Sequence, residues 1–154
     1  MANTYPNTIL IRPNEPAGGD RELNEAVVAT AVIKPGMLIE WASASTVQPA
    51  STAADTSAPA MWAVENPYIA ASSTLAVDTT YAVGAVCYFI WSQPGDKLYA
   101  LLETGANVTV PGVGLQSNGS GALEIFTSGR IVAFSDAVLN NTTGSDARLK
   151  VRAA

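Results

Sequence analysis

The sequence predicts an all-β fold, namely a small β-barrel or β-tulip-like domain with an extended N-terminal arm. First, its apolar runs are short and rich in valine and aromatic residues, which favour strands, and no capped helical pattern competes with them. Second, Pro-Gly pairs at 35–36, 94–95 and 111–112 each separate two such runs and suit the central positions of a type II turn. Third, no apolar run approaches the roughly 20 residues that a membrane helix needs.

The first 24 residues predict an arm rather than a part of the core. They hold three prolines and a Gly-Gly pair, and proline removes hydrogen-bond donors from a sheet and favours extended backbone before it. Only Thr8–Ile11 (TILI) is β-like in this region, and it would need a surface on which to lie. Residues 25–154 fit a single barrel domain, because a chain of about 150 residues buries roughly 70% of its unfolded surface.

Strands are expected in order along residues 25–154. Val27–Ile33 and Met37–Trp41 flank the first Pro-Gly turn, and the small polar residues of Ala42–Ala60 predict a surface loop. Thr80–Trp91 is the most β-prone run and is expected to be the central strand. The sequence Ser117-Asn-Gly-Ser120 predicts a hairpin, because Asn-Gly tolerates the positive φ angles of a tight turn.

The final stretch, ARLKVR, alternates between apolar and basic residues, as a half-buried strand does. The apolar positions would face the core, and the basic positions Arg148, Lys150 and Arg152 would face outward. Two interpretations fit this pattern. The basic face could be solvated and protect a sheet edge, or it could lie against an acidic partner surface.

The composition argues against several classes of function. The chain has no histidine and one cysteine, Cys87, which is expected to be a buried, inert thiol in the central strand. We therefore expect no catalytic residues, no cofactor and no metal site, and we read Asp78, Asp96 and Asp136 as structural residues of turns and strand ends. A net charge of −5 with scattered basic residues argues against nucleic acid as a partner. The N-terminus lacks the pattern of a secretory signal, so synthesis in a reducing cytoplasm is expected.

The middle of the chain carries a resemblance to a known family. Residues 83–125 combine a β-run entering Gly95-Asp96, a second β-run at Leu98–Leu102, a short loop at Gly105–Asn107 and a hairpin at Ser117–Leu123. This pattern resembles bacteriophage head decoration proteins, also called capsid cement proteins. The upstream VIKPGMLIEW and the downstream IVAFSDAV are similar to that family's opening and closing strands, so the resemblance covers about residues 26–152.

The resemblance implies a structural virion protein on the outer surface of an expanded phage capsid, made in the cytoplasm of a bacterial host. Members bind the major capsid protein, usually as homotrimers and sometimes as dimers, and bridge its neighbouring subunits. No enzymatic activity, cofactor, nucleic acid or membrane is implied.

Two segments are the candidates for contact with the capsid: the β-like part of the arm and the basic positions of the closing strand. The candidate residues are Thr8, Ile9, Leu10, Ile11, Arg12, Arg148, Lys150 and Arg152. We expect the arm to add a strand to an exposed edge of the capsid protein, the alternative being that it packs on its own barrel or on a sister subunit.

Two other functions remain open. A carbohydrate-binding or enzyme-accessory β-domain would show facing acids in a cleft or a row of exposed tryptophans. For Trp41, Trp62 and Trp91, packing in the core is the expected role. A tail or fibre subunit would favour a longer and more repetitive chain than this one.

Overall fold

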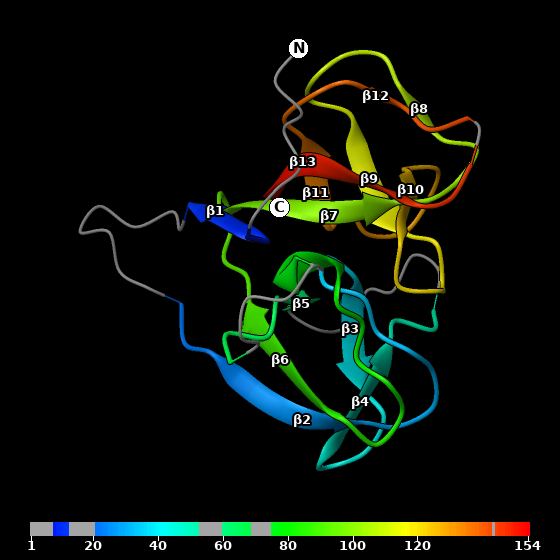
Figure 1. The fold of residues 1–154 in the computed structure, drawn as a ribbon. Coiled ribbons are helices and arrows are strands. Elements are labelled where there is room, and N and C mark those ends of the chain that lie inside the picture. The colour runs from blue at the N-terminus through cyan, green and yellow to red at the C-terminus, as the bar shows by residue number, and fades with distance from the viewer. Residues whose placement is uncertain (1–7, 13–20, 53–59, 69–74, 143) are drawn as a thin grey trace.

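The structure, a computed structural model, describes residues 8–12, 21–52, 60–68, 75–142 and 144–154. These residues form strands, and the one helical element among them is the 3₁₀ turn η1 (Ala76–Asp78). The all-β class with small barrels is therefore confirmed (Figure 1). The strands are β1 (Leu10–Arg12), β2 (Asn24–Val28), β3 (Leu38–Trp41), β4 (Thr46–Pro49), β5 (Met61–Ala63), β6 (Val86–Trp91), β7 (Lys97–Leu102), β8 (Asn107–Val108), β9 (Gly114–Ser117), β10 (Leu123–Ile125), β11 (Ala133–Ser135), β12 (Leu139–Asn140) and β13 (Ala147–Ala153).

The first half of the chain folds into a closed barrel with the strand order β2-β4-β3-β5-β6. β2 completes it by pairing antiparallel with β6 and parallel with β4. Alternate residues of these strands point inward because side chains alternate across a strand. The buried cluster that they form includes Ala26, Val28, Ile39, Val47, Met61, Ala63, Cys87 and Phe89.

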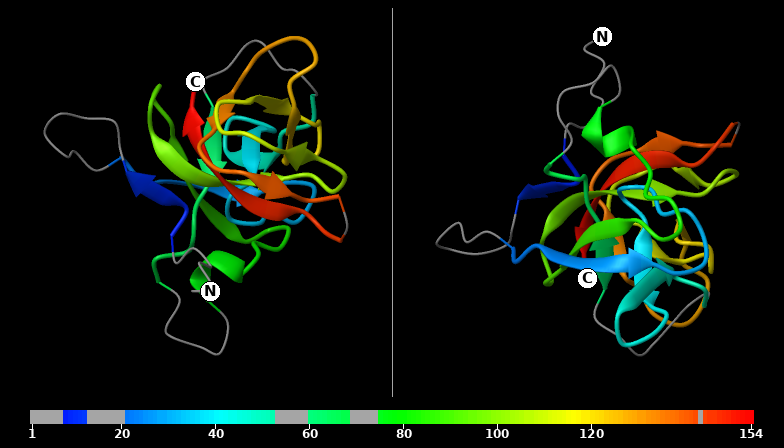
Figure 2. Two further views of the ribbon diagram at one scale, coloured as in Figure 1. Left: turned by 90° about the horizontal axis from the view of Figure 1, so that it is seen from above. Right: turned by 60° about the horizontal axis from the view of Figure 1, so that its bottom comes forward.

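The second half forms a six-stranded sheet with the order β1-β7-β10-β9-β11-β13. An additional pairing of β13 with β7, the second strand in this order, closes β7, β10, β9, β11 and β13 into a ring. β1 lies beside β7 on the outside of this ring (Figures 1 and 2). A separate two-stranded sheet, β8 with β12, extends one end of this half.

The two closed sheets share a core. Leu38, Trp62 and Ile90 from the first sheet belong to the same buried cluster as residues from inside the second. Burial of this apolar surface stabilises each sheet against the other, at roughly 25 cal/mol per Å² removed from water. The residues of the second sheet in this cluster include Leu98, Ala100, Leu102, Leu115, Leu123, Leu149 and Val151.

Gly36 lies where the two sheets contact each other. Its φ angle is +94°, as the predicted type II turn requires, and its carbonyl accepts a hydrogen bond from the Leu101 N–H at 2.9 Å. A Cβ atom at this position would lie 3.0 Å from the Tyr99 carbonyl oxygen. The glycine is therefore needed both for its turn and for the contact between sheets.

Several expectations from the sequence differ from the observed strands. The sequence predicts one barrel over 25–154, whereas the described residues form two closed sheets. β6 pairs with β2 on one edge and with β5 on the other, so β7 cannot join it as a hairpin. The chain instead passes to the second sheet at the Pro94-Gly95 turn, where the Gly95 N–H donates to the Ala153 carbonyl at 2.9 Å. The central strand is also shorter than predicted, since Tyr81 forms only an isolated bridge with Ile33.

The prediction of a surface loop over Ala42–Ala60 was wrong in part. β4 lies within it and pairs with both β2 and β3, and Val47 is fully buried. One apolar residue among small polar ones gives too little alternation to indicate a strand, so this pairing is set by tertiary context. Residues 53–59 of that segment lie outside the described residues.

Candidate interaction surface

The β-like part of the arm is packed on its own chain. Ile9 is fully buried, its N–H donates to a carboxylate oxygen of Glu65 at 2.9 Å, and its carbonyl accepts from the Tyr99 N–H at 2.9 Å. Leu10 is half-buried against the core, while Thr8 and Ile11 are exposed. Of the arm's other residues, 1–7 and 13–20 lie outside the described part of the chain.

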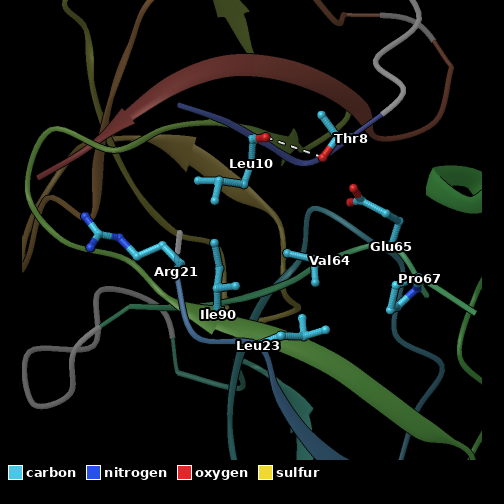
Figure 3. A pocket seen from close by; sticks show the side chains of 8 residues that line it. All are labelled: Thr8, Leu10, Arg21, Leu23, Val64, Glu65, Pro67 and Ile90. Atoms are coloured by element: carbon cyan, nitrogen blue, oxygen red, sulfur yellow. Dashed lines mark hydrogen bonds between the residues drawn. The ribbon is translucent and has the colours of Figure 1, made fainter. Parts of the chain in front are cut away.

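A groove of about 350 Å³ lies between this segment and the first barrel (Figure 3). Apolar side chains form most of its wall, with a basic and an acidic residue among them. Its lining residues are Thr8, Leu10, Arg21, Leu23, Val64, Glu65, Pro67 and Ile90. Because Glu65 accepts the Ile9 N–H and Arg21 is bound to Asp96, the charged groups of the groove already have structural roles.

Asp96 and Arg21 form a buried ion pair that holds the end of the arm to the second sheet. The guanidinium donates to both carboxylate oxygens, from Nε to Oδ2 at 2.8 Å and from Nη2 to Oδ1 at 2.7 Å. Oδ2 also accepts from the Gln93 N–H at 2.9 Å, so the carboxylate closes the turn that precedes β7. The structural role that the sequence predicted for Asp96 is thus observed, whereas its pairing with the arm was not foreseen.

Three cations surround one carboxylate on the outside of the second sheet. Asp136 lies 3.3 Å from the Lys97 Nζ, 3.6 Å from the Lys150 Nζ and 3.0 Å from the Arg152 Nη2. We call these four residues the basic face. Partial burial acts to raise the pKa of Asp136, but the hydrogen bond and charge of Lys97, with the charges of Arg152 and Lys150, outweigh it and lower that pKa below its usual value.

Arg148 contacts other groups than the basic face does. Its guanidinium pairs with Asp78 at 2.7 Å and donates to the carbonyls of Pro35, at 3.2–3.3 Å, and Val77. These groups belong to the first half of the chain, so Arg148 joins β13 to it. The alternation predicted for 147–152 is observed, but β13 pairs with both β7 and β11 and is therefore not a sheet edge.

The strand register brings the two candidate segments, the arm and the closing strand, to either side of β7. Arg12 on β1 pairs across from Lys97 on β7, and Lys97 pairs in turn with Arg152 on β13. Neighbouring strands lie about 4.8 Å apart, so the row crosses roughly 10 Å from β1 to β13. Lys97 and Asp136 were not among the predicted contact residues. The alternation of Lys97 and Tyr99 with buried Leu98 and Ala100 is the signal that could have placed Lys97 outward.

The tryptophans do not form a row. Trp62 is fully buried, and its indole N–H donates to the Ser92 hydroxyl at 3.0 Å. Trp41 is 44% exposed and packs edge-on against Phe89, with ring centroids 5.6 Å apart. Trp91 is half-buried and contacts the same ring at 6.4 Å. The core role predicted for tryptophan is therefore confirmed for Trp62, while Trp41 differs from it.

The described residues offer little reactive chemistry. Cys87 is buried, and desolvation raises the pKa of its thiol to about 12, which keeps it protonated. Desolvation by burial likewise raises the pKa of Tyr81, whose hydroxyl donates to the Val64 carbonyl at 2.7 Å. Across the described ranges, no three acidic or cysteine residues gather as they would around a metal ion.

No family model matches the chain, and no curated protein matches it significantly. In the described part of the chain, no helix has the length and apolar character needed to cross a membrane.

Proposed function

We propose that this protein is a structural component of a bacteriophage head, which binds the outer surface of the expanded capsid and holds neighbouring major capsid protein subunits together. The observation that carries the proposal is the convergence of β1 and β13 on β7, which brings the strand segments of the candidate contact residues Arg12 and Arg152 to either side of Lys97 in an all-β body. The resemblance of residues 83–125 to head decoration proteins points to the same function.

The proposed action is adhesion by many copies. A homotrimer, or alternatively a dimer, presents the same face several times, and a shell subunit can then separate only if several contacts break together. Linked contacts of this kind gain by effective concentration, so that modest single affinities suffice, and avidity can exceed a single affinity by about 10²–10⁴-fold.

The sequence predicts that the arm adds a strand to the capsid protein, whereas β1 is suited to accept a strand from it. The segment Thr8–Ile11 is not a free strand in this structure, because it already pairs with β7 and buries Ile9. β1 is instead an edge strand, since no other described strand pairs with its second edge. Such an edge can accept an extended segment of the capsid protein through main-chain hydrogen bonds.

Imaging of reconstituted shells tests the proposed function. Purified protein is mixed with expanded, undecorated capsids, with unexpanded shells as the control, and bound density is located by electron microscopy. We expect saturable extra density over local three-fold or two-fold axes of the expanded shell. Absence of density at saturating protein concentration would contradict the proposal. Deletion of residues 1–24 is not a clean test, because it removes Ile9 from the core and leaves Asp96 without Arg21.

One observation favours a second candidate, a carbohydrate-binding β-domain. Exposed Trp41 and half-buried Trp91 both contact Phe89, and exposed indole rings stack on sugars. A screen of soluble oligosaccharides by thermal shift tests this candidate, because a ligand that binds only the folded state raises the melting temperature. A shift that is lost in Trp41→Ala supports it, and no shift with any sugar rejects it.

A further inference from the structure

The basic face has a surplus of positive charge in an acidic protein. Three cations and one carboxylate give it a net charge of +2, whereas the whole chain carries −5. Lys97, Lys150 and Arg152 are 33%, 37% and 51% exposed, so their charges reach solvent. On the neighbouring strand β1, the backbone of Arg12 lies in register with Lys97. Three of the eight basic residues of the chain therefore lie on this face.

One carboxylate does not balance these cations. The side chains of Lys97, Lys150 and Arg152 all approach Asp136, which brings their like charges close to one another. The depressed pKa of Asp136 is consistent with a positive potential at this position. A further anion would reduce the repulsion among the cations, because opposite charges within about 4–6 Å stabilise each other.

Apolar side chains continue the same row around the sheet. Phe134 on β11 lies in register with Arg152 on one side and with Gly114 on the other. It is 39% exposed, and Val138, two residues beyond Asp136, is 58% exposed. Arginine and aromatic residues are enriched in protein interfaces, whereas isolated charged clusters are typical of solvated surfaces.

We propose that the basic face is the docking site for an acidic segment of the capsid's outer surface, whose carboxylates lie among Lys97, Lys150 and Arg152. This inference rests on the proposed function and names the chemistry of the partner. Charge complementarity selects an acidic occupant, and the adjoining Phe134 and Val138 select a polypeptide over a phosphate backbone, because nucleic-acid binding depends on a longer array of cations than this.

Two matched pairs of variants test the proposal. Lys150→Gln and Lys34→Gln both remove one positive charge, but Lys34 is exposed on the loop before β3 and is not one of the four residues of the basic face. Asp136→Asn and Glu22→Gln both remove one negative charge, and Glu22 is exposed just before β2. Circular dichroism and thermal melting establish that each variant is folded. If Asp136→Asn fails to fold, the lysine pair alone decides.

The probes are expanded, undecorated capsids, an oligoglutamate peptide and double-stranded DNA, each at increasing NaCl concentration. We expect Lys150→Gln to weaken capsid and peptide binding about fivefold, Asp136→Asn to strengthen both about two- to fivefold, and the two controls to change neither. Binding should weaken as salt rises from about 0.1 M to 1 M, where the screening length falls from roughly 10 Å to 3 Å.

The outcomes separate this inference from the proposed function. If the protein binds capsids but Lys150→Gln and Lys34→Gln bind them with equal affinity, the basic face is not the docking site and the proposed function stands. If the protein does not bind capsids but binds oligoglutamate, and Lys150→Gln weakens that binding, the proposed function fails. The inference that the basic face selects acidic polypeptides then holds. Tighter binding to DNA than to oligoglutamate, or self-association that Lys150→Gln abolishes, would overturn the inference.

Discussion

Substitution of Arg21 by methionine tests the buried ion pair most directly. The two side chains are 6% and 0% exposed, and two short hydrogen bonds join them. Removing one partner of a buried pair leaves the other charge uncompensated, at a cost of about 3–5 kcal/mol. We therefore expect Arg21→Met to lower the free energy of unfolding by about that amount. For a domain of about 150–250 residues this corresponds to a fall in melting temperature of roughly 6–20 °C.

The assay is guanidinium denaturation followed by tryptophan fluorescence, with thermal melting as a second measurement. Arg152→Met is the matched control, because its guanidinium is 51% exposed and an exposed ion pair contributes only about 0–1 kcal/mol. The double variant Arg21→Met, Asp96→Asn removes the uncompensated charge and should recover part of the loss. Equal stability losses in Arg21→Met and Arg152→Met would refute this reasoning, since burial would then make no difference.

Three further predictions concern stability and reactivity. Gly36→Ala should destabilise the protein by about 1–3 kcal/mol more than Gly84→Ala, because both have positive φ but only Gly36 has a backbone oxygen 3.0 Å from the added Cβ. The folded pKa of Asp136 is depressed, so its stabilisation is fully present above the unfolded pKa of about 3.9 and is lost as pH falls through the lower folded pKa. The melting-temperature difference between wild type and Asp136→Asn should therefore be largest at pH 7 and disappear once Asp136 is protonated in the folded state. The Cys87 thiol, with a pKa of about 12, should react with a thiol reagent at pH 8 only after unfolding.

Each of these predictions has a result that contradicts it. Equal losses in the two glycine variants, measured by denaturation, would mean that the contact with Tyr99 is not tight. If the difference in melting temperature between wild type and Asp136→Asn persists at acid pH, the charge of Asp136 is not the cause of that difference. Labelling of Cys87 faster than global unfolding, measured by mass spectrometry, would indicate local opening of the first barrel.

The fold class was predictable because its signals are local. A positive φ at Gly36, Gly95 and Gly112 follows from the Pro-Gly pairs. A hairpin joins β9 to β10 at the predicted place, but its loop runs from Asn118 to Ala122 and is longer than the tight Asn-Gly turn expected. β4 and the second closed sheet depend instead on pairings between distant residues, such as β13 with β7. Periodicity in one strand does not specify its partner, so these features did not follow from the pattern.

The candidate surface was predictable in part for the same reason. The alternation of apolar and basic residues correctly predicted that Lys150 and Arg152 face outward, because this pattern depends only on the strand itself. It directed Arg148 outward as well, but the carbonyls and carboxylate that bind this residue come from about 70–113 positions away in the chain. Lys97 and Asp136 join the surface through the register of β7 and β13, which no local pattern encodes.

The closure of the second sheet by β13 has a consequence for the order of folding. The first barrel uses only strands between residues 24 and 91, so all its pairings are available early in synthesis. The ring around β7 lacks a strand until residues 147–153 have left the ribosome. Until then the apolar faces of β7, β9 and β11 remain uncovered, and the nascent chain depends on the completed first barrel to shield part of them.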